Sequence, residues 1–352
     1  MASRYGIHTI ELFHRLSRKW FDIVFDKLKE SKSGKFYPDE TYRSDTGMEK
    51  YISTSFSKRG VVIYLYRQKR SKNKTDKNMA CFIRFRLNPL SLVNGNYQPK
   101  EVFRAEKSQL NTLDNCMNDL LHELGLSVTF EDLTLSRIDC CLDLFPDSQE
   151  WVDEALRVMR RSKVMKTYKE SRFPKGDLNH KEKNKHSWRI HCKTTTITAY
   201  DKTFQLLEED LLEDYDAPML RIEVSRTSAK FKRGLSDEIK GSNKKILHTV
   251  MEESEDTIRK YLKSLHADAV HVKYEECIRQ IGTVKGKKTR EHMKLLVDKL
   301  SDCKSYEQAI QNSGLSKSQL RTVDKQFGKL GISPITIRNK APFDRLQIVE
   351  GL

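Results

Sequence analysis

The sequence predicts an α+β protein, with a central, mainly antiparallel sheet, helices packed on one face of it, and a helical C-terminal region. Three observations lead to this prediction. Segments that alternate apolar and polar residues recur along the first part of the chain, and stripes of apolar residues at helical spacing separate them. From about Ser236 onward the chain becomes helical and polar. We therefore expect a sheet-containing domain over residues 1–235 and a helical domain over residues 236–352.

The first predicted elements are a helix and three strands. Apolar residues recur at helical spacing in SRKWFDIVFDKLKES, which predicts a packing helix. YISTSF and VVIYLYRQ flank residues 57–60, an arrangement typical of a hairpin. ACFIRFRLNP alternates apolar residues with Phe82, Arg84 and Arg86, so we expect one apolar face and one basic face on this strand.

The middle of the chain continues with helices and three further strands. Apolar spacing predicts a helix over residues 106–125, and LTLSRIDCCLDLFPD follows as a strand. Asp147 and Glu150 have the spacing of a capping box for the helix in QEWVDEALRVMRR. The strands in TTTITAYDKT and MLRIEVSRT come next, on either side of a helix over about residues 204–214.

The charge and the apolar content limit the classes of partner. The chain of 352 residues has 65 Lys and Arg against 49 Asp and Glu, a net charge of +16, which favours a polyanion such as nucleic acid over an anionic membrane surface. No apolar run is long enough to span a membrane, and the charged N-terminal residues do not resemble a signal peptide, so we expect a cytoplasmic protein. The seven cysteines include no CxxC pair and are expected to be reduced thiols.

Two segments have the composition of DNA-binding surfaces. Between residues 162 and 193, basic residues alternate with aromatic ones, which is typical of either a solvated loop or a track for single-stranded DNA. SYEQAIQNSGLSKSQLRTVDKQFGKLGIS predicts two short helices, which form either a packing hairpin or a DNA-reading helix-turn-helix. The basic residues expected to contact DNA in these segments are Lys181, Lys183, Lys185, Arg189, Lys317 and Arg321.

Three strands carry polar residues on one face. Alternation along LTLSRIDCCLDLFPD places Arg137, Asp139 and Asp143 on the face opposite its apolar residues. The same alternation groups Arg221 with Glu223 in one of the two later strands, and Tyr200 with Lys202 in the other. If these strands share a sheet, their polar faces form a site.

Two interpretations of this polar face remain open. Three neighbouring carboxylates, Asp139, Asp143 and Glu223, repel one another unless a hard cation such as Mg²⁺ or Mn²⁺ lies between them. Alternatively, Arg137–Asp139 and Arg221–Glu223 are ion pairs on a solvated face, which contribute little. A tyrosine beside a metal and a lysine would be a competent nucleophile toward a phosphodiester, although Tyr64 and Tyr66 are rivals to Tyr200.

The segments FIRFRLNPLSL, LSRIDCCLDLF, TAYDKTFQLLEE and LRIEVSRT, in this order, resemble motifs of rolling-circle replication initiators. The resemblance is to the Rep_trans family of plasmid and conjugative-element initiators and to the gene II/X replication proteins of filamentous phages. It covers about residues 51–230, with a weaker similarity around GLSKSQL in the C-terminal helices. Such initiators nick one strand at a replication origin through a tyrosine that stays linked to the 5′ phosphate, assisted by a divalent cation.

The resemblance implies roles for individual residues. It implies that Tyr200 is the nucleophile and that Asp139, Glu223 and Asp143 hold Mg²⁺ or Mn²⁺. Lys202 would lower the pKa of the tyrosine or contact the phosphate. Because the plasmid initiators often have a glutamate where this chain has Arg86, that residue is expected to contact a phosphate. The remaining expected DNA contacts in these motifs are Arg84, Arg137 and Arg221.

The resemblance also implies a fold, partners and alternatives. We expect a nuclease core like that of the HUH enzymes but without their His-x-His motif, because neither WRIHCK nor LHADAVH has that spacing. Residues 1–235 would then be the catalytic domain. The expected partners are origin DNA with a single-stranded or extruded nick site, a host helicase and a DNA polymerase, and a homodimer is one expected assembly. A conjugative relaxase with the same chemistry and a non-enzymatic, sequence-specific DNA-binding regulator are the alternatives.

Overall fold

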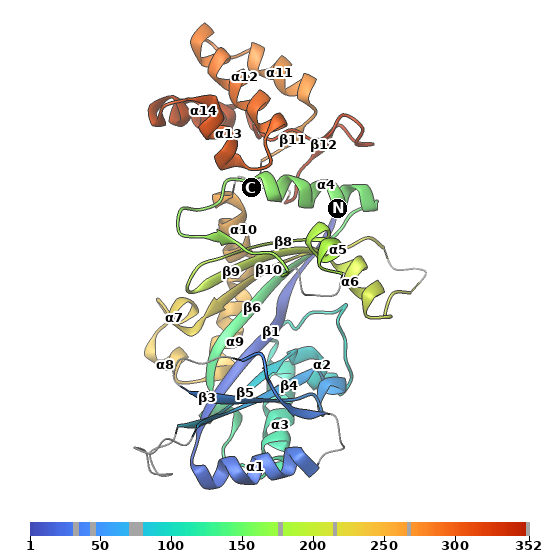
Figure 1. Cartoon of the computed structure of the whole chain (residues 1–352), viewed down its shortest axis with the longest axis vertical. Coiled ribbons are helices and arrows are strands. Elements are labelled where there is room, and N and C mark those ends of the chain that lie inside the picture. The colour runs from blue at the N-terminus through green and yellow to red at the C-terminus, as the bar shows by residue number, and fades with distance from the viewer. Residues whose placement is uncertain are drawn as a thin grey trace. The chain divides into compact units, whose positions relative to one another are not determined.

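The computed structural model confirms the α+β fold and the antiparallel sheet (Figure 1). It describes residues 1–30, 35–42, 47–69, 80–174, 179–213, 217–265 and 269–349. Within these residues, ten strands form one sheet in the order β2-β3-β4-β5-β1-β6-β10-β9-β8-β7. The strands are β1 (Ala2–Leu16), β2 (Phe36–Pro38), β3 (Met48–Ser53), β4 (Val61–Gln68), β5 (Cys81–Leu87), β6 (Thr134–Phe145), β7 (Lys169–Glu170), β8 (Ser187–His191), β9 (Thr195–Asp201) and β10 (Leu220–Thr227).

The described chain divides into two compact units, each built from non-contiguous segments. Unit 1 consists of residues 1–4, 142–224 and 255–352, and unit 2 consists of residues 5–141 and 225–254. The chain passes from one unit to the other within β1, β6 and β10, and a fourth time at the start of α10 (Ser254–Ser264). The predicted division into residues 1–235 and 236–352 remains a prediction about function.

Unit 2 contains strands β2 to β5 and the helices of its two segments, residues 5–141 and 225–254. Its helices are α1 (Arg18–Glu30), α2 (Pro89–Asn94), α3 (Lys107–Glu123), α7 (Ser228–Phe231), α8 (Asp237–Lys240) and α9 (Asn243–Glu252). The predicted hairpin is confirmed, since β3 and β4 pair antiparallel on either side of residues 57–60. In β5 the predicted apolar face is buried, and Ile83 and Phe85 pair with Leu65 and Ile63 of β4 to form a core that α1 covers.

One long strand of the sheet was not predicted. β1 has no clear alternation, because Ile7 and Ile10 are buried next to Gly6 and Thr9, which are buried as well. In the strand order β1 lies between β5 and β6, and its consecutive buried residues at 6–7 and 9–10 break the simple alternation of a half-buried strand.

Unit 1 contains β7, β8 and β9, and the helical C-terminal region. Its helices are α4 (Gln149–Arg161), α5 (His180–Lys185), α6 (Lys202–Glu208), α10 (Ser254–Ser264), α11 (Tyr274–Gly282), α12 (Lys287–Asp302), α13 (Tyr306–Ser313) and α14 (Lys317–Leu330). The short strands β11 (His271–Val272) and β12 (Arg345–Leu346) pair next to them. Helix α4 packs on β8 and β9, and its buried Glu154 accepts hydrogen bonds from Arg157 and Arg338, which fastens the C-terminal segment to this helix.

Two predicted details of these helices are wrong. The N-cap position of α4 is occupied by Ser148, whose side chain forms no capping hydrogen bond. Asp147 and Glu150 therefore do not make the predicted capping box. Helix α6 begins at Lys202 and ends at Glu208, earlier than the predicted residues 204–214, part of which lies outside the described residues. Among the described residues no helix is both long and apolar enough to cross a membrane.

Candidate active site

Tyr200 lies beside a carboxylate in unit 1. Its half-buried side chain projects from β9, and its hydroxyl donates a hydrogen bond of 2.7 Å to Oε1 of Glu223 on β10. The two strands are neighbours in the sheet, so backbone pairing holds the phenol and the carboxylate together. Glu223 is therefore in position to accept the phenolic proton, as a general base must be.

Lys202 lies close to the same tyrosine, but not on the predicted strand face. β9 ends at Asp201, and Lys202 is the first residue of α6, with its side chain fully buried. Its Nζ lies 5.9 Å from the centre of the Tyr200 ring and donates to Oε1 of Gln205 at 2.9 Å. Burial, followed by the charge of Arg221, lowers the pKa of Lys202 to about 8. This ammonium group can therefore lose its proton near neutral pH.

Asp143 is enclosed by two arginines. The buried Arg221 binds it through two bonds, Nε to Oδ1 at 2.5 Å and Nη2 to Oδ2 at 2.9 Å. Arg4 adds Nη2 to Oδ2 at 2.8 Å. Arg221 is buried and binds Asp143, so it does not lie on a solvated face, and its pairing with Glu223 stays a prediction.

Asp139 belongs to unit 2 and is also bound by an arginine. Nε and Nη2 of Arg137 each donate to one of its carboxylate oxygens at 2.7 Å, and the Asp139 side chain is buried. Arg137 also contacts Oγ of Ser225 at 3.0 Å and Oε1 of Glu11 at 3.2 Å. The expected Arg137–Asp139 ion pair is present, but it is buried rather than on a solvated face.

These contacts bear on the predicted metal ligands. Arginines already neutralise the charge of Asp139 and Asp143, and the oxygens of both carboxylates accept their hydrogen bonds. A cation bound to either residue would have to share or displace an arginine, because carboxylate oxygens that are directed at a guanidinium are not directed at a metal. The ligand roles of Asp139, Asp143 and Glu223 remain predictions.

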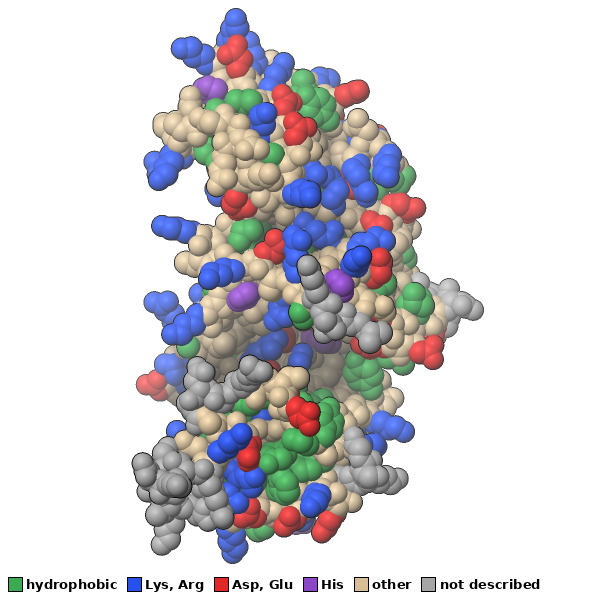
Figure 2. Space-filling model, in the orientation of Figure 1, with side chains coloured by type: hydrophobic (Ala, Val, Ile, Leu, Met, Phe, Trp, Pro, Cys, Tyr) green, Lys and Arg blue, Asp and Glu red, His purple; other side chains and the backbone are tan. Residues whose placement is uncertain are grey.

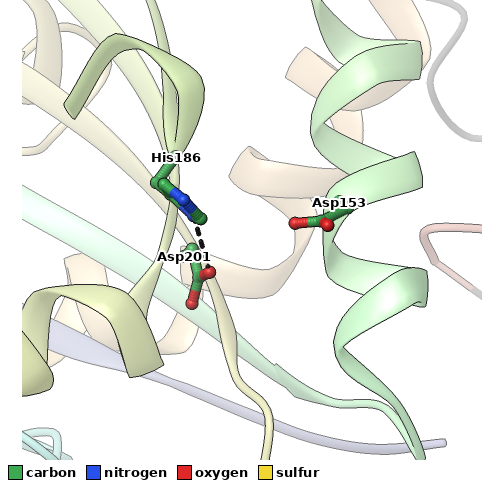
Figure 3. Close-up of side chains that lie close together, drawn as sticks. All are labelled: Asp153, His186 and Asp201. Carbon is green, nitrogen blue, oxygen red and sulfur yellow. Dashed lines mark hydrogen bonds and ion pairs between the residues drawn. The ribbon is translucent and has the colours of Figure 1, made fainter. Parts of the chain in front are cut away.

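A different group of side chains in unit 1 has the spacing of a metal site. Ligand atoms of Asp153 on α4, His186 before β8 and Asp201 at the end of β9 all lie within 4.8 Å of one another (Figure 3). Nδ1 of His186 is 3.0 Å from Oδ2 of Asp201. Mixed imidazole and carboxylate donors suit Mn²⁺ better than Mg²⁺, which prefers oxygen ligands.

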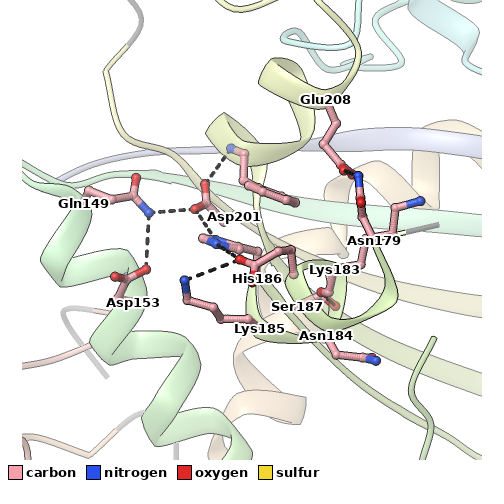
Figure 4. A network of polar contacts seen from close by, with 12 residues as sticks. Gln149, Asp153, Asn179, Lys183, Asn184, Lys185, His186, Ser187, Asp201 and Glu208 are labelled. Carbon is pink, nitrogen blue, oxygen red and sulfur yellow. Dashed lines mark hydrogen bonds and ion pairs between the residues drawn. The ribbon is translucent and has the colours of Figure 1, made fainter. Parts of the chain in front are cut away.

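Protein groups already satisfy the buried member of this group (Figure 4). Asp201 accepts from Nε2 of Gln149 at 2.6 Å and from the backbone N–H of Phe204 at 2.9 Å, which caps α6. Nε2 of Gln149 also lies 3.4 Å from Oδ1 of Asp153, so one amide bridges the two carboxylates. The ring of His186 stacks on that of Phe204, with centroids 4.0 Å apart. Since adjacent residues of a strand project to opposite faces, Asp201 and the Tyr200 hydroxyl lie on opposite faces of β9.

The predicted DNA contacts lie on several elements, and Lys and Arg side chains are visible over much of the face in Figure 2. Arg86 on β5 is exposed, whereas Arg84 is half-buried and lies 3.8 Å from Glu11. On the exposed side of α5 and β8 lie Lys181, Lys185 and Arg189, with the half-buried Lys183 among them. Lys317 and Arg321 are exposed on α14. Arg137 and Arg221 bind carboxylates, and their contacts with DNA stay predictions.

The rival tyrosines have other surroundings. Tyr66 is buried and stacks on Phe82, and burial raises its pKa to about 12, which disfavours a nucleophilic phenolate. Tyr64 is half-buried on β4, with Nζ of Lys50 located 4.8 Å from its ring centre. Among the described tyrosines the predicted Tyr200 is the one that hydrogen-bonds to the predicted Glu223.

Sequence reasoning missed several residues of these clusters. Asp201, between Tyr200 and Lys202, was not predicted as a site residue, although Asp before a helix is a common N-cap. His186 was not singled out because it lies among the many basic residues of segment 162–193. Arg4 and Gln149 carry no pattern that could have indicated their partners, because both contacts join residues far apart in the sequence.

No protein-family model matches the sequence, and no curated protein matches it. Among solved structures, the chain is similar to the rolling-circle replication initiator protein from Geobacillus stearothermophilus, with 9% sequence identity, a TM-score of 0.30, and coverage of 74% of this chain and 85% of that chain. A TM-score this low carries no argument about function. What the protein does must be inferred from its own residues and their contacts.

Proposed function

We propose that this protein is a rolling-circle replication initiator that nicks one DNA strand at its origin and rejoins it, using Tyr200 as the nucleophile. The observation that carries the proposal is the 2.7 Å hydrogen bond from the Tyr200 hydroxyl to Glu223. A phenol is a poor nucleophile until a base removes its proton, and a carboxylate at this distance can do so. The net charge of +16 supports a nucleic-acid substrate.

In the proposed step, the Tyr200 oxygen attacks the scissile phosphorus while Glu223 takes the phenolic proton. The bond from phosphorus to the 3′ oxygen breaks, that oxygen takes up a proton, and the 5′ phosphate stays linked to Tyr200. A host polymerase then extends the free 3′-hydroxyl, with a host helicase opening the duplex. Attack by a 3′-hydroxyl on the phosphotyrosine reverses the step, so rejoining needs no ATP.

Lys202 supplies charge to this reaction. Its ammonium group lies next to the Tyr200 ring and is shielded from water, so its field acts on the developing phenolate with little screening. Because its pKa is about 8, this charge is largely present at neutral pH and is lost in mildly alkaline solution. We assign Lys202 to stabilising the phenolate that forms when Glu223 accepts the proton.

A divalent cation, Mg²⁺ or Mn²⁺, would polarise a non-bridging oxygen of the phosphate when bound. Glu223 is the predicted ligand nearest to Tyr200, whereas Asp139 and Asp143 would have to release an arginine. The group of Asp153, His186 and Asp201 fits a cation by its spacing, but it lies on the other face of β9. Asp153→Asn is therefore expected to leave Mn²⁺-dependent nicking unchanged. Loss of nicking in this variant would place the assisting cation in that group.

The test is adduct formation on supercoiled DNA that carries the element's own origin, with Mn²⁺ or with EDTA. The wild-type protein should yield a nicked circle and a protein–DNA adduct on denaturing gels. Tyr200→Phe should yield neither, because it removes a single oxygen. Tyr64→Phe is the matched control, since Tyr64 is a half-buried tyrosine on another strand, and it should nick normally. An adduct that persists in Tyr200→Phe would contradict the proposal.

One observation favours a second candidate, a DNA-binding regulator without enzymatic activity. Both Asp139 and Asp143 are neutralised by arginines, which is how a purely structural charged layer would be built. In that case the wild-type protein binds origin DNA equally well in EDTA and Mn²⁺ and forms no adduct with either.

A further inference from the structure

The C-terminal helices of unit 1 contain a compact three-helix arrangement. Helix α12 packs against both α13 and α14, and all three lie close together in Figure 1. Three residues join α13 to α14, and the first, Gly314, has a φ of +64° that favours glycine. Ser316 and Gln319 form a capping box that begins α14. A short helix, a three-residue turn with glycine and a longer helix packed on a third are the features of a helix-turn-helix.

The inner side of this arrangement is well anchored. Val323 and Phe327 of α14 and Tyr306 of α13 are buried. The hydroxyl of Tyr306 donates to Oδ1 of Asp324 at 3.4 Å, and Lys163 lies 3.6 Å from the same carboxylate. The single acidic residue of α14 is therefore engaged on the packed side of the helix.

The outer side of α14 is basic. Lys317, Arg321 and Lys325 follow one another at intervals of four residues and are exposed, as is Lys329. Within the described residues none of these four side chains takes part in an ion pair. Elsewhere in unit 1 exposed helices pair their arginines within the helix, for example Arg279 with Glu276 in α11 at 2.7 Å. The positive charge of α14 is thus left available to an external anion.

We infer that α14 is a recognition helix that binds the major groove of B-form duplex DNA. The occupant is a duplex because a packed helix-turn-helix presents one convex, regularly spaced basic face, which fits the major groove. Single-stranded DNA is instead bound by basic grooves with aromatic stacking platforms, and the exposed residues of α14 include no aromatic side chain. Lys317 and Lys325 would contact phosphates, while Arg321, at the centre of the face, can pair with a guanine edge.

This inference deepens the proposed function and rests on it for the identity of the DNA, which would be the duplex beside the nick site. The nicking residues would then react with a single strand, while α14 would bind the flanking duplex. Binding to duplex DNA requires neither Tyr200 nor a cation. An experiment can therefore contradict duplex binding by α14 without contradicting nicking by Tyr200, and the reverse.

The experiment compares Lys317→Ala/Arg321→Ala with a matched control, Lys260→Ala/Lys263→Ala. The control removes the same charge from exposed positions of α10 in the same unit, where neither lysine forms an ion pair with any residue that the structure describes. Fluorescence anisotropy with a random-sequence duplex, an origin duplex and the corresponding single strands is recorded in EDTA over a range of salt concentrations. Thermal melting checks that each variant is folded.

The α14 variant should lose about tenfold or more of its duplex affinity, and the slope of log affinity against log salt should fall by about 2, while the control changes little. It should still form the Tyr200 adduct on a single-stranded oligonucleotide from the origin. Arg321→Lys should retain affinity for the random duplex but lose preference for the origin duplex. Duplex affinity equal to that of the control, or an equal loss for single strands, would overturn the inference.

Discussion

Asp143 and Glu223 are two carboxylates of the same unit on adjacent strands, and their partners differ in kind. Asp143 is buried between two permanently charged guanidinium groups, whereas Glu223 is half-buried and accepts a hydrogen bond from a neutral phenol. An arginine cannot take or give a proton near neutral pH, so the two arginines beside Asp143 can bind it but cannot exchange a proton with it. Tyr200 can transfer its proton, so Glu223 can act as a base. The residue that binds each carboxylate, rather than the carboxylate itself, therefore distinguishes the structural role of Asp143 from the proposed catalytic role of Glu223.

The largest expected effect concerns the contacts between Asp143 and its two arginines. Arg221→Ala should lower the free energy of unfolding by about 3–5 kcal/mol, because it removes two short bonds from a fully buried carboxylate. Arg4→Ala should cost less, about 1–2 kcal/mol, since Arg4 is partly exposed and the two bonds from Arg221 remain. Urea denaturation measures both. Equal losses would show that the two arginines are equivalent.

The chemical side is tested by Glu223→Gln. The amide can accept a hydrogen bond from Tyr200 but cannot accept its proton, so single-turnover adduct formation should slow by about 10²–10³-fold. The melting temperature should change little because the shape of the side chain is retained. A variant that nicks at the wild-type rate would show that Glu223 only positions the tyrosine.

Lys202 sharpens the comparison, since it is a buried charge whose ammonium group donates to the neutral amide of Gln205. Its pKa is about 8 in the folded protein and 10.5 as the ordinary value, so between these pH values the unfolded chain binds more protons. Wild-type stability should therefore rise from about pH 8 to pH 10.5, while below pH 8 the penalty for a buried charge is fully present. Lys202→Met should remove this penalty, stabilise the protein at pH 7 by about 1–3 kcal/mol and slow nicking. Thermal melts of the wild type and of Lys202→Met at pH 7 and at pH 10.5 test this. A difference in stability between the two proteins that is equal at both pH values would contradict it.

The smallest expected effect concerns the third carboxylate, Asp201, which caps α6 and contacts Gln149 and His186. Asp201→Ala should destabilise by about 1–2 kcal/mol, because it removes the cap of α6 and the contact with His186. Asp201→Asn should cost less, since asparagine also caps helices. Chemical denaturation of the two variants separates capping from charge, and equal losses would assign the effect to the charge.

Much of the fold follows from local patterns, whereas the pairing within the site does not. Alternation in β5 predicted its buried face correctly because only one face of this strand is packed, while Arg84 and Arg86 lie on the other. β1 was missed because consecutive buried residues at 6–7 and 9–10 interrupt its alternation. Arg221 and Asp143 are 78 residues apart, and their contact depends on a register between strands that no local pattern contains. Tyr200 and Glu223 could be proposed as neighbours only because their motifs resemble a known set.

The interleaving of the two compact units has a consequence for inheritance. Each unit is assembled from separate stretches of the chain, and the four crossings fall inside β1, β6 and β10 and at the start of α10 rather than in linkers. Neither unit can be encoded by one uninterrupted stretch of gene, so neither can be gained or lost as a cassette by simple recombination. Removing one unit whole would cut three strands of the sheet, and we expect this protein to evolve by substitution within an intact chain instead.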